Sequence, residues 1–121
     1  MGMINGFRRR RRLGVWLYRA NGDPSPVARE IEGLRTVSRG TVAAAFEMVA
    51  LREDPPPNTE ETRGPVTCFR VPYGDSCAYI FCAFPTYRNK LIGLHVVESG
   101  RTGPPEDAYA LAQDRYRLAV L

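Results

Sequence analysis

The sequence contains a single histidine, His95, and this is the side chain best suited to acid–base chemistry near neutral pH. An imidazole titrates close to neutrality, so His95 could donate or accept a proton in a transfer reaction. Glu98, three residues further on, is a second group that could accept a proton. His95 also stands between Leu94 and Val96 in an apolar run, so a half-buried, hydrogen-bonded core histidine is the alternative interpretation.

A run of arginines near the N-terminus carries the excess positive charge of the chain: Arg8, Arg9, Arg10, Arg11 and Arg12. The formal net charge is +4, and removing these five leaves 12 basic residues against 13 acidic ones, a net charge of −1. Such a run can contact nucleic-acid phosphates, with an affinity that falls as the salt concentration rises. A basic tail without a fixed role is the alternative. We expect residues 1–12 to form a mobile arm and residues 13–121 to form one domain.

The three cysteines, Cys68, Cys77 and Cys82, form no CxxC pair and are accompanied by only one histidine. We therefore expect free thiols in a reducing cytoplasm, with no metal site and no cofactor. No apolar run approaches the roughly 18 to 20 residues that a membrane-spanning helix needs, so no membrane association is expected.

Hydrophobic periodicity and turn residues predict the order strand, helix, helix, three antiparallel strands, helix. Ser25 and Pro26 supply an N-cap and a first-turn proline for the first helix, and the prolines at 55–57 end the second. The polar residues 53–64 are predicted to form a solvated loop. The expected fold is α+β, an antiparallel four-stranded sheet with two helices on one face and a C-terminal helix (β-α-α-β-β-β-α). The expected strands are 13–20, 65–71, 76–84 and 91–97, and the helices begin at about 26, 38 and 104.

Two local phrases carry a family resemblance. Residues 15–27 (VWLYRANGDPSPV) and residues 92–97 (IGLHVV), followed by a polar loop and Pro104-Pro105-Glu106, stand in the same order and spacing as matching phrases of the RelE/ParE superfamily. The chain resembles the toxins of type II toxin–antitoxin systems in this superfamily, in particular their phage-derived HigB-like branch. Arg70 stands where these proteins carry an arginine before the central hairpin. The resemblance spans roughly residues 15–117 and implies the RelE-like fold.

The resemblance implies an endoribonuclease that enters the ribosome, cuts mRNA and blocks translation until an antitoxin, expected to be a small helix-turn-helix protein, binds it. The family's chemistry is a metal-free attack of a ribose 2′-hydroxyl on the adjacent phosphate, which needs cations and groups that transfer protons. Arg70 and Arg101 would hold the phosphate, and His95 or Glu98 would handle the proton. Further contacts to RNA would come from the arginine arm and from Tyr73, Tyr79, Arg88 and Lys90.

The chain also departs from the family pattern where positive charge is needed. Glu98 and Ser99 stand where HigB-like toxins carry two lysines, and residues 77–79 (CAY) replace a segment in which many carry an arginine. These departures favour two alternatives. One is a non-enzymatic, ParE-like inhibitor of DNA gyrase, and the other is a catalytically inactive phage or prophage binding module.

Overall fold

The computed structural model describes residues 14–19, 25–35, 39–51, 59–84 and 90–119. They form three helices and five strands, so the α+β prediction is confirmed. In chain order the elements are β1 (Gly14–Leu17), α1 (Pro26–Glu32), α2 (Arg39–Ala50), β2 (Thr59–Arg63), β3 (Val66–Tyr73), β4 (Ser76–Ala83), β5 (Lys90–Gly100) and α3 (Ala108–Ala119).

The strands form one mixed sheet in the order β1-β5-β4-β3-β2. The last four strands in the sequence make an antiparallel meander, whereas β1 pairs in parallel with β5, from Gly14 opposite Lys90 to Leu17 opposite Gly93. The predicted four-stranded antiparallel sheet is therefore wrong in two respects: a fifth strand is present, and the first strand runs parallel to its neighbour.

The additional strand is β2, which lies in the segment predicted to be a loop. Its sequence, TEETR, has no apolar alternation, and Glu61, Thr62 and Arg63 are exposed at the edge of the sheet. A tight turn at Gly64, with φ of 57°, joins it to β3, and the ladder then runs from Arg63 opposite Val66 to Thr59 opposite Phe69. Arg63 also places its guanidinium 4.1 Å from the ring centre of Tyr109 on α3. Hairpin pairing and tertiary contact thus hold a strand that has no hydrophobic face of its own.

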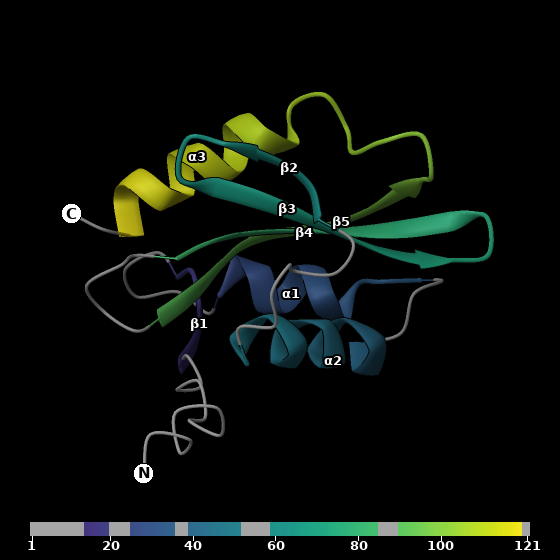
Figure 1. Cartoon of the computed structure of the whole chain (residues 1–121), viewed down its shortest axis with the longest axis horizontal. Coiled ribbons are helices and arrows are strands. Elements are labelled where there is room, and N and C mark those ends of the chain that lie inside the picture. Colours follow the sequence, from purple (N-terminus) through teal and green to yellow (C-terminus); the bar gives the residue numbers. More distant parts are fainter. Residues whose placement is uncertain (1–13, 20–24, 36–38, 52–58, 85–89, 120–121) are drawn as a thin grey trace, which may run out of the picture.

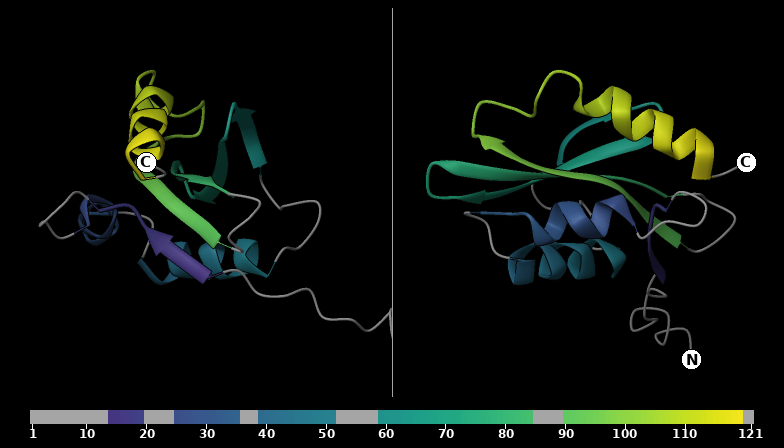
Figure 2. Two further views of the ribbon diagram at one scale, coloured as in Figure 1. Left: turned by 90° about the vertical axis from the view of Figure 1, so that its left-hand side faces the viewer. Right: turned by 180° about the vertical axis from the view of Figure 1, so that it is seen from behind.

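Helices cover both faces of the sheet (Figures 1 and 2). The two N-terminal helices share one face, as predicted, and α3 packs on the other. Buried side chains consequently form two clusters, one between the sheet and α1 and α2, and one between the sheet and α3. The central strand β4 is buried from Cys77 to Ala83 because it is covered on both sides.

The start of α1 is the local prediction that the structure confirms most directly. Ser25 is the N-cap, and its Oγ accepts a hydrogen bond from the backbone N–H of Ala28 at 3.2 Å. The same hydroxyl donates to the carbonyl of Tyr18 at 2.6 Å. One side chain therefore caps the helix and ties it to the residue that follows β1.

Gly93 marks the closest approach between β5 and its neighbours. A Cβ at this position would lie 2.9 Å from Cδ2 of Leu17 and 3.1 Å from two ring carbons of Phe46. Because Leu17 and Phe46 would have to move, Gly93→Ala is expected to lower the free energy of unfolding by about 1 to 2 kcal/mol. Urea denaturation measures this value. Gly100→Ala is the matched control on the same strand, because a Cβ there would meet nothing within 4 Å. Equal stability of the two variants would contradict the prediction.

Candidate functional site

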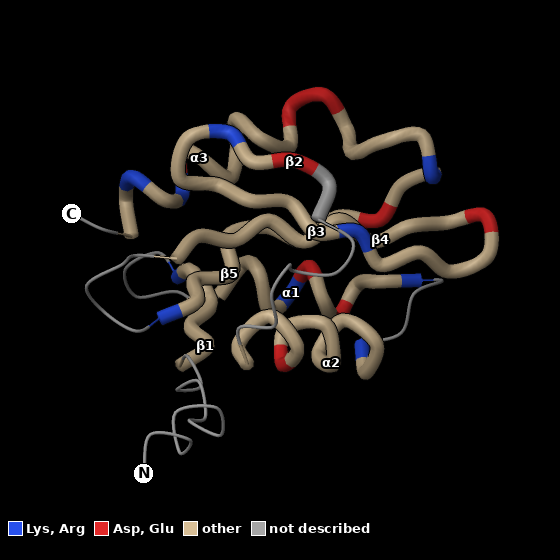
Figure 3. The backbone as a smooth tube through the Cα atoms, in the orientation of Figure 1, with Lys and Arg blue, Asp and Glu red and all other residues tan. Residues whose placement is uncertain are grey.

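Two of the predicted phosphate-binding residues meet at one end of the sheet. Arg70 on β3 donates a hydrogen bond from Nη2 to the backbone carbonyl of Arg101 at 2.6 Å. Arg101 lies directly after β5, and its side chain is exposed. We call this pair the Arg70–Arg101 corner. Figure 3 shows both signs of charge around the end of β5 and the following loop, so the corner is cationic within a mixed surface.

Tyr79 lies next to the Arg70–Arg101 corner and holds the end of β5 in place. It pairs with Arg70 across β3 and β4, so the two side chains lie on the α3 face of the sheet. Its ring is fully buried, and its hydroxyl donates a hydrogen bond to the carbonyl of Gly100 at 2.6 Å. A buried ring has no face open to a nucleobase, so Tyr79 acts here as a packing residue that fixes the end of β5. Tyr73, at the tip of the β3–β4 hairpin, has 55% of its surface exposed, so its ring is accessible to a nucleobase.

Glu98 lies on the opposite face of the sheet from the corner. It pairs with Ala78, whose side chain belongs to the core cluster beneath α1 and α2. Its Oε1 accepts a hydrogen bond from the backbone N–H of Arg35, just after α1, at 2.9 Å. The carboxylate therefore braces the end of α1 against β5, and the sheet separates it from Arg70.

His95 lies on the α3 face, where a bulge in β5 turns two successive side chains, Leu94 and His95, the same way. Its ring stacks on Phe81, with centres 5.7 Å apart. Nδ1 lies 3.0 Å from Oε1 of Glu30 on α1, a contact of ion-pair type that lacks the angles of a hydrogen bond. The imidazole is 12% exposed, which agrees with the half-buried alternative.

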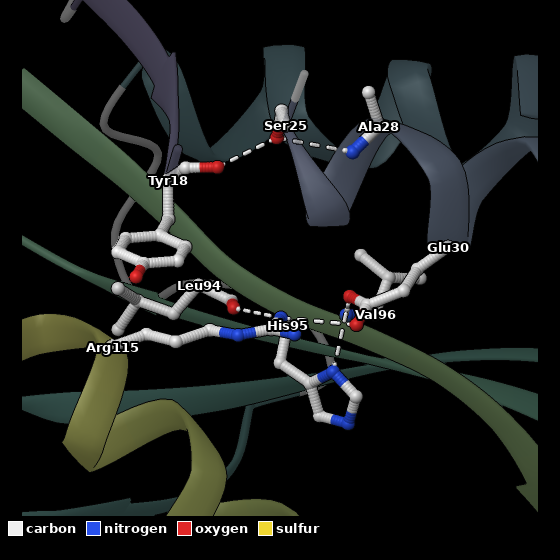
Figure 4. A network of polar contacts seen from close by, with 8 residues as sticks. All are labelled: Tyr18, Ser25, Ala28, Glu30, Leu94, His95, Val96 and Arg115. Atoms are coloured by element: carbon white, nitrogen blue, oxygen red, sulfur yellow. Dashed lines mark hydrogen bonds and ion pairs between the residues drawn. The ribbon is translucent and has the colours of Figure 1, made fainter. Parts of the chain in front are cut away.

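Glu30 is the centre of a polar group that the sequence did not reveal (Figure 4). Its Oε1 accepts a hydrogen bond from the backbone N–H of Val96 at 3.0 Å, and its Oε2 accepts one from Arg115 Nη1 on α3 at 3.0 Å. Arg115 Nη1 also donates to the carbonyl of Leu94 at 2.9 Å. We call Glu30, His95 and Arg115 the Glu30 cluster.

The Glu30 cluster closes the edge of β5 beyond the end of β1. The pairing with β1 ends at Leu17, and the N–H of Tyr18 makes one more bond to the carbonyl of Gly93. From Leu94 onward no described strand pairs with this edge, and two helix side chains make the hydrogen bonds instead: Arg115 of α3 donates to the carbonyl of Leu94, and Glu30 of α1 accepts from the N–H of Val96. Burial alone would raise the pKa of Glu30, but contacts with His95, Val96 and Arg115 outweigh it and hold the pKa below its usual value.

The structure thus keeps both candidate proton-transfer groups away from the corner. His95 is two strands across and two residues along from Arg70, which corresponds to about 12 Å between Cα atoms. Tyr79 and Phe81 occupy the strand between them. Arg70 and Arg101 are therefore together, whereas His95 belongs to the Glu30 cluster and Glu98 to the other face.

Of the remaining candidates, Lys90 lies at the far end of β5, with Nζ 4.1 Å from the ring centre of Trp16. Arg88 and the five arm residues Arg8, Arg9, Arg10, Arg11 and Arg12 lie outside the described residues, as does the whole segment predicted to be a mobile arm.

A shallow apolar groove runs beside the corner, on the other face of β3. It has a volume of about 360 Å³, and Met48 in its wall is 41% exposed. Residues of α2 and β3 line it: Thr41, Ala44, Ala45, Met48, Val49, Phe69, Arg70, Val71 and Pro72. The β2 ladder ends at Phe69, so it does not extend along this part of β3.

Comparison with known protein families finds no family model that matches the chain, and no curated protein matches it either. Among the described residues, no helix is both long and apolar enough to cross a membrane. In the same part of the chain, no three His, Cys, Asp or Glu side chains are grouped so that they could hold a metal ion.

Proposed function

We propose that this chain is a RelE/HigB-type toxin domain that blocks translation by binding RNA, without cutting it. The observation that carries the proposal is the hydrogen bond from Arg70 to the carbonyl of Arg101, because it joins two cationic residues at one end of the sheet. Support for the family comes from the two sequence phrases and from an element order that differs from the expected one by the additional strand β2. In this proposal, the Arg70–Arg101 corner would provide the phosphate contact.

The contacts of His95 and Glu98 argue against cleavage. Attack by a 2′-hydroxyl needs a group within hydrogen-bond reach that takes its proton, and another that protonates the leaving oxygen. His95 is in contact with Glu30 and stacked on Phe81, and Glu98 faces α1. A site that has cations to bind a phosphate but no group to transfer the protons would hold the RNA without cleaving it.

In a toxin of this kind, a cognate antitoxin would cover the active surface. The apolar groove between α2 and β3 adjoins Arg70, so a partner seated there would also restrict access to the corner. A small helix-turn-helix protein, the partner expected from the resemblance, would lay an apolar segment in the groove.

The test is a translating cell extract with a reporter mRNA, measured by protein yield and by primer extension on the same samples. The chain should reduce the yield without producing new mRNA ends. Arg70→Ala and Arg101→Ala should each raise the concentration needed for inhibition by about tenfold, the value of one charged hydrogen bond. Each substitution should also reduce by about one the number of counterions released on RNA binding, which is obtained from the slope of log affinity against log salt concentration.

Arg117→Ala is the matched control, because Arg117 is 71% exposed on α3 and its one ion pair among the described residues is with Asp114. Its inhibition should equal that of the unaltered chain. Cuts within codons that disappear in Arg70→Ala would show a nuclease and contradict the proposal. Intact translation with inhibited DNA supercoiling would favour the gyrase alternative.

A further inference from the structure

A second surface of interest lies at the opposite end of β5 from the corner. Trp16 on β1 has 56% of its surface exposed, and Lys90 lies over its ring at 4.1 Å. Together with neighbouring residues they line a pocket of about 210 Å³ between β1, the start of β5 and the end of α3: Trp16, Leu17, Tyr18, Arg19, Lys90, Ile92 and Ala119. The extent of β5 from Lys90 to Gly100 places it about 30 Å from the Arg70–Arg101 corner.

The charge of this surface is positive. Arg19 is exposed beside the pocket, and no acidic residue is among those that line it. Within the described part of the chain, Figure 3 shows no acidic segment next to the basic ones at β1 and the start of β5.

An exposed indole flanked by cations fits a specific chemistry. Aromatic rings stack on nucleobases whatever their identity, while Lys and Arg beside them neutralise the phosphates. The pocket's volume suits one base against Trp16, and the bases of single strands are accessible for such stacking, whereas those of a duplex are already stacked. An acidic peptide would satisfy the cations but would leave the exposed indole uncovered.

We infer that the Trp16–Lys90 surface is a stacking site for single-stranded RNA. One base stacks on Trp16, the Lys90 ammonium moves from the ring to an adjoining phosphate, and Arg19 contacts a neighbouring phosphate. Only the choice of RNA over DNA rests on the proposed function. The site itself rests on the pocket, and it needs neither a ribosome nor the Arg70–Arg101 corner.

Trp16 is the only tryptophan in the chain, so its fluorescence reports on this site alone. The experiment titrates the full chain with 12-nucleotide single-stranded RNA, the same RNA as a duplex, 12-nucleotide single-stranded DNA and a seven-residue glutamate peptide. We expect saturable quenching by the single-stranded RNA, with weaker quenching by the others. Anisotropy of labelled RNA should show that Trp16→Ala weakens binding about 5- to 150-fold, whereas Trp16→Phe retains most of the affinity.

Lys90→Gln should reduce the slope of log affinity against log salt by about 0.7, as for one phosphate contact on a single strand. Arg101→Ala is the control for the proposed function: its Trp16 quenching should persist even if translation inhibition is lost. RNA binding that leaves Trp16 fluorescence unchanged would overturn the inference. So would an unaltered affinity in Trp16→Ala, or quenching by DNA or by the glutamate peptide that matches or exceeds that by RNA.

Discussion

Replacing Glu30 by alanine is expected to lower the free energy of unfolding by about 2 to 3 kcal/mol at pH 7, the value of a lost charged hydrogen bond with a partner left unsatisfied. The carboxylate accepts from the N–H of Val96 and from Arg115, and it lies against His95. Its removal leaves the N–H of Val96 without its acceptor, and the partly buried guanidinium of Arg115 loses its carboxylate while it keeps the carbonyl of Leu94. Urea denaturation followed by circular dichroism measures the change.

The contribution of Glu30 should also depend on pH with a definite sign. Its pKa in the folded protein is lower than in the unfolded chain, so the folded state favours the charged form. The stabilisation is therefore complete above the usual pKa of about 4.5 and is lost as the pH falls below that value. The difference in melting temperature between the unaltered chain and Glu30→Gln should shrink between pH 5 and about pH 3.

Glu32→Gln is the matched control, because Glu32 is exposed on the same helix and the substitution changes the charge equally. It should change the stability by less than about 0.5 kcal/mol. A Glu30 effect no larger than that of Glu32, or one that grows on acidification, would contradict the role assigned to the Glu30 cluster.

The second large effect concerns the thiols. Cys68, Cys77 and Cys82 have no exposed surface and form no disulfide. Burial, with a smaller contribution from Cys68, raises the pKa of the Cys82 thiol well above its usual value. The folded chain should therefore react with a thiol reagent such as DTNB at least about 1,000-fold more slowly than the chain in 8 M urea, because reaction requires opening of the core.

Thr102→Cys supplies the control, since Thr102 is exposed in the loop after β5. Its added thiol should react rapidly in the folded protein, while the three native thiols do not. Native thiols that react as fast as the added one would show that the sheet opens readily, and the cysteines would then be candidates for redox chemistry.

Much of the fold was predictable because its signals are local. Ser25 and Pro26 fixed the start of α1, and the two-residue turn at Gly74-Asp75 set the β3–β4 hairpin. The strand β2 was missed because a strand exposed at an edge needs no apolar alternation. The parallel pairing of β1 was missed because it joins segments distant in sequence. The unbroken apolar run from Cys77 to Ala83 did contain one unused signal: it is typical of a strand covered on both faces.

The candidate site was harder to predict, since it depends on which face each strand residue occupies. The bulge at Leu94 places His95 on the side of the sheet that α3 covers, and no local sequence pattern indicates that β5 has an extra residue there. Glu30 and Arg115 were not predicted because each has the sequence context of an ordinary polar helix residue. They form hydrogen bonds to each other and to β5 only because the fold brings α1, β5 and α3 together. Arg70 and Arg101 were each predicted to hold the phosphate, but the hydrogen bond between them, from the Arg70 side chain to the backbone carbonyl of Arg101, was not predicted.

The pairing of Gly14 with Lys90 also has a consequence for synthesis of the chain. The two residues are 76 positions apart, so the ribosome must add β2, β3, β4 and the start of β5 before β1 can pair. At ordinary elongation rates of about 5 to 20 residues per second, this delay is about 4 to 15 seconds. During that interval the first strand is unpaired, and the nascent chain carries five arginines, separated from this strand by Leu13 alone, beside the polyanionic machine that is making it.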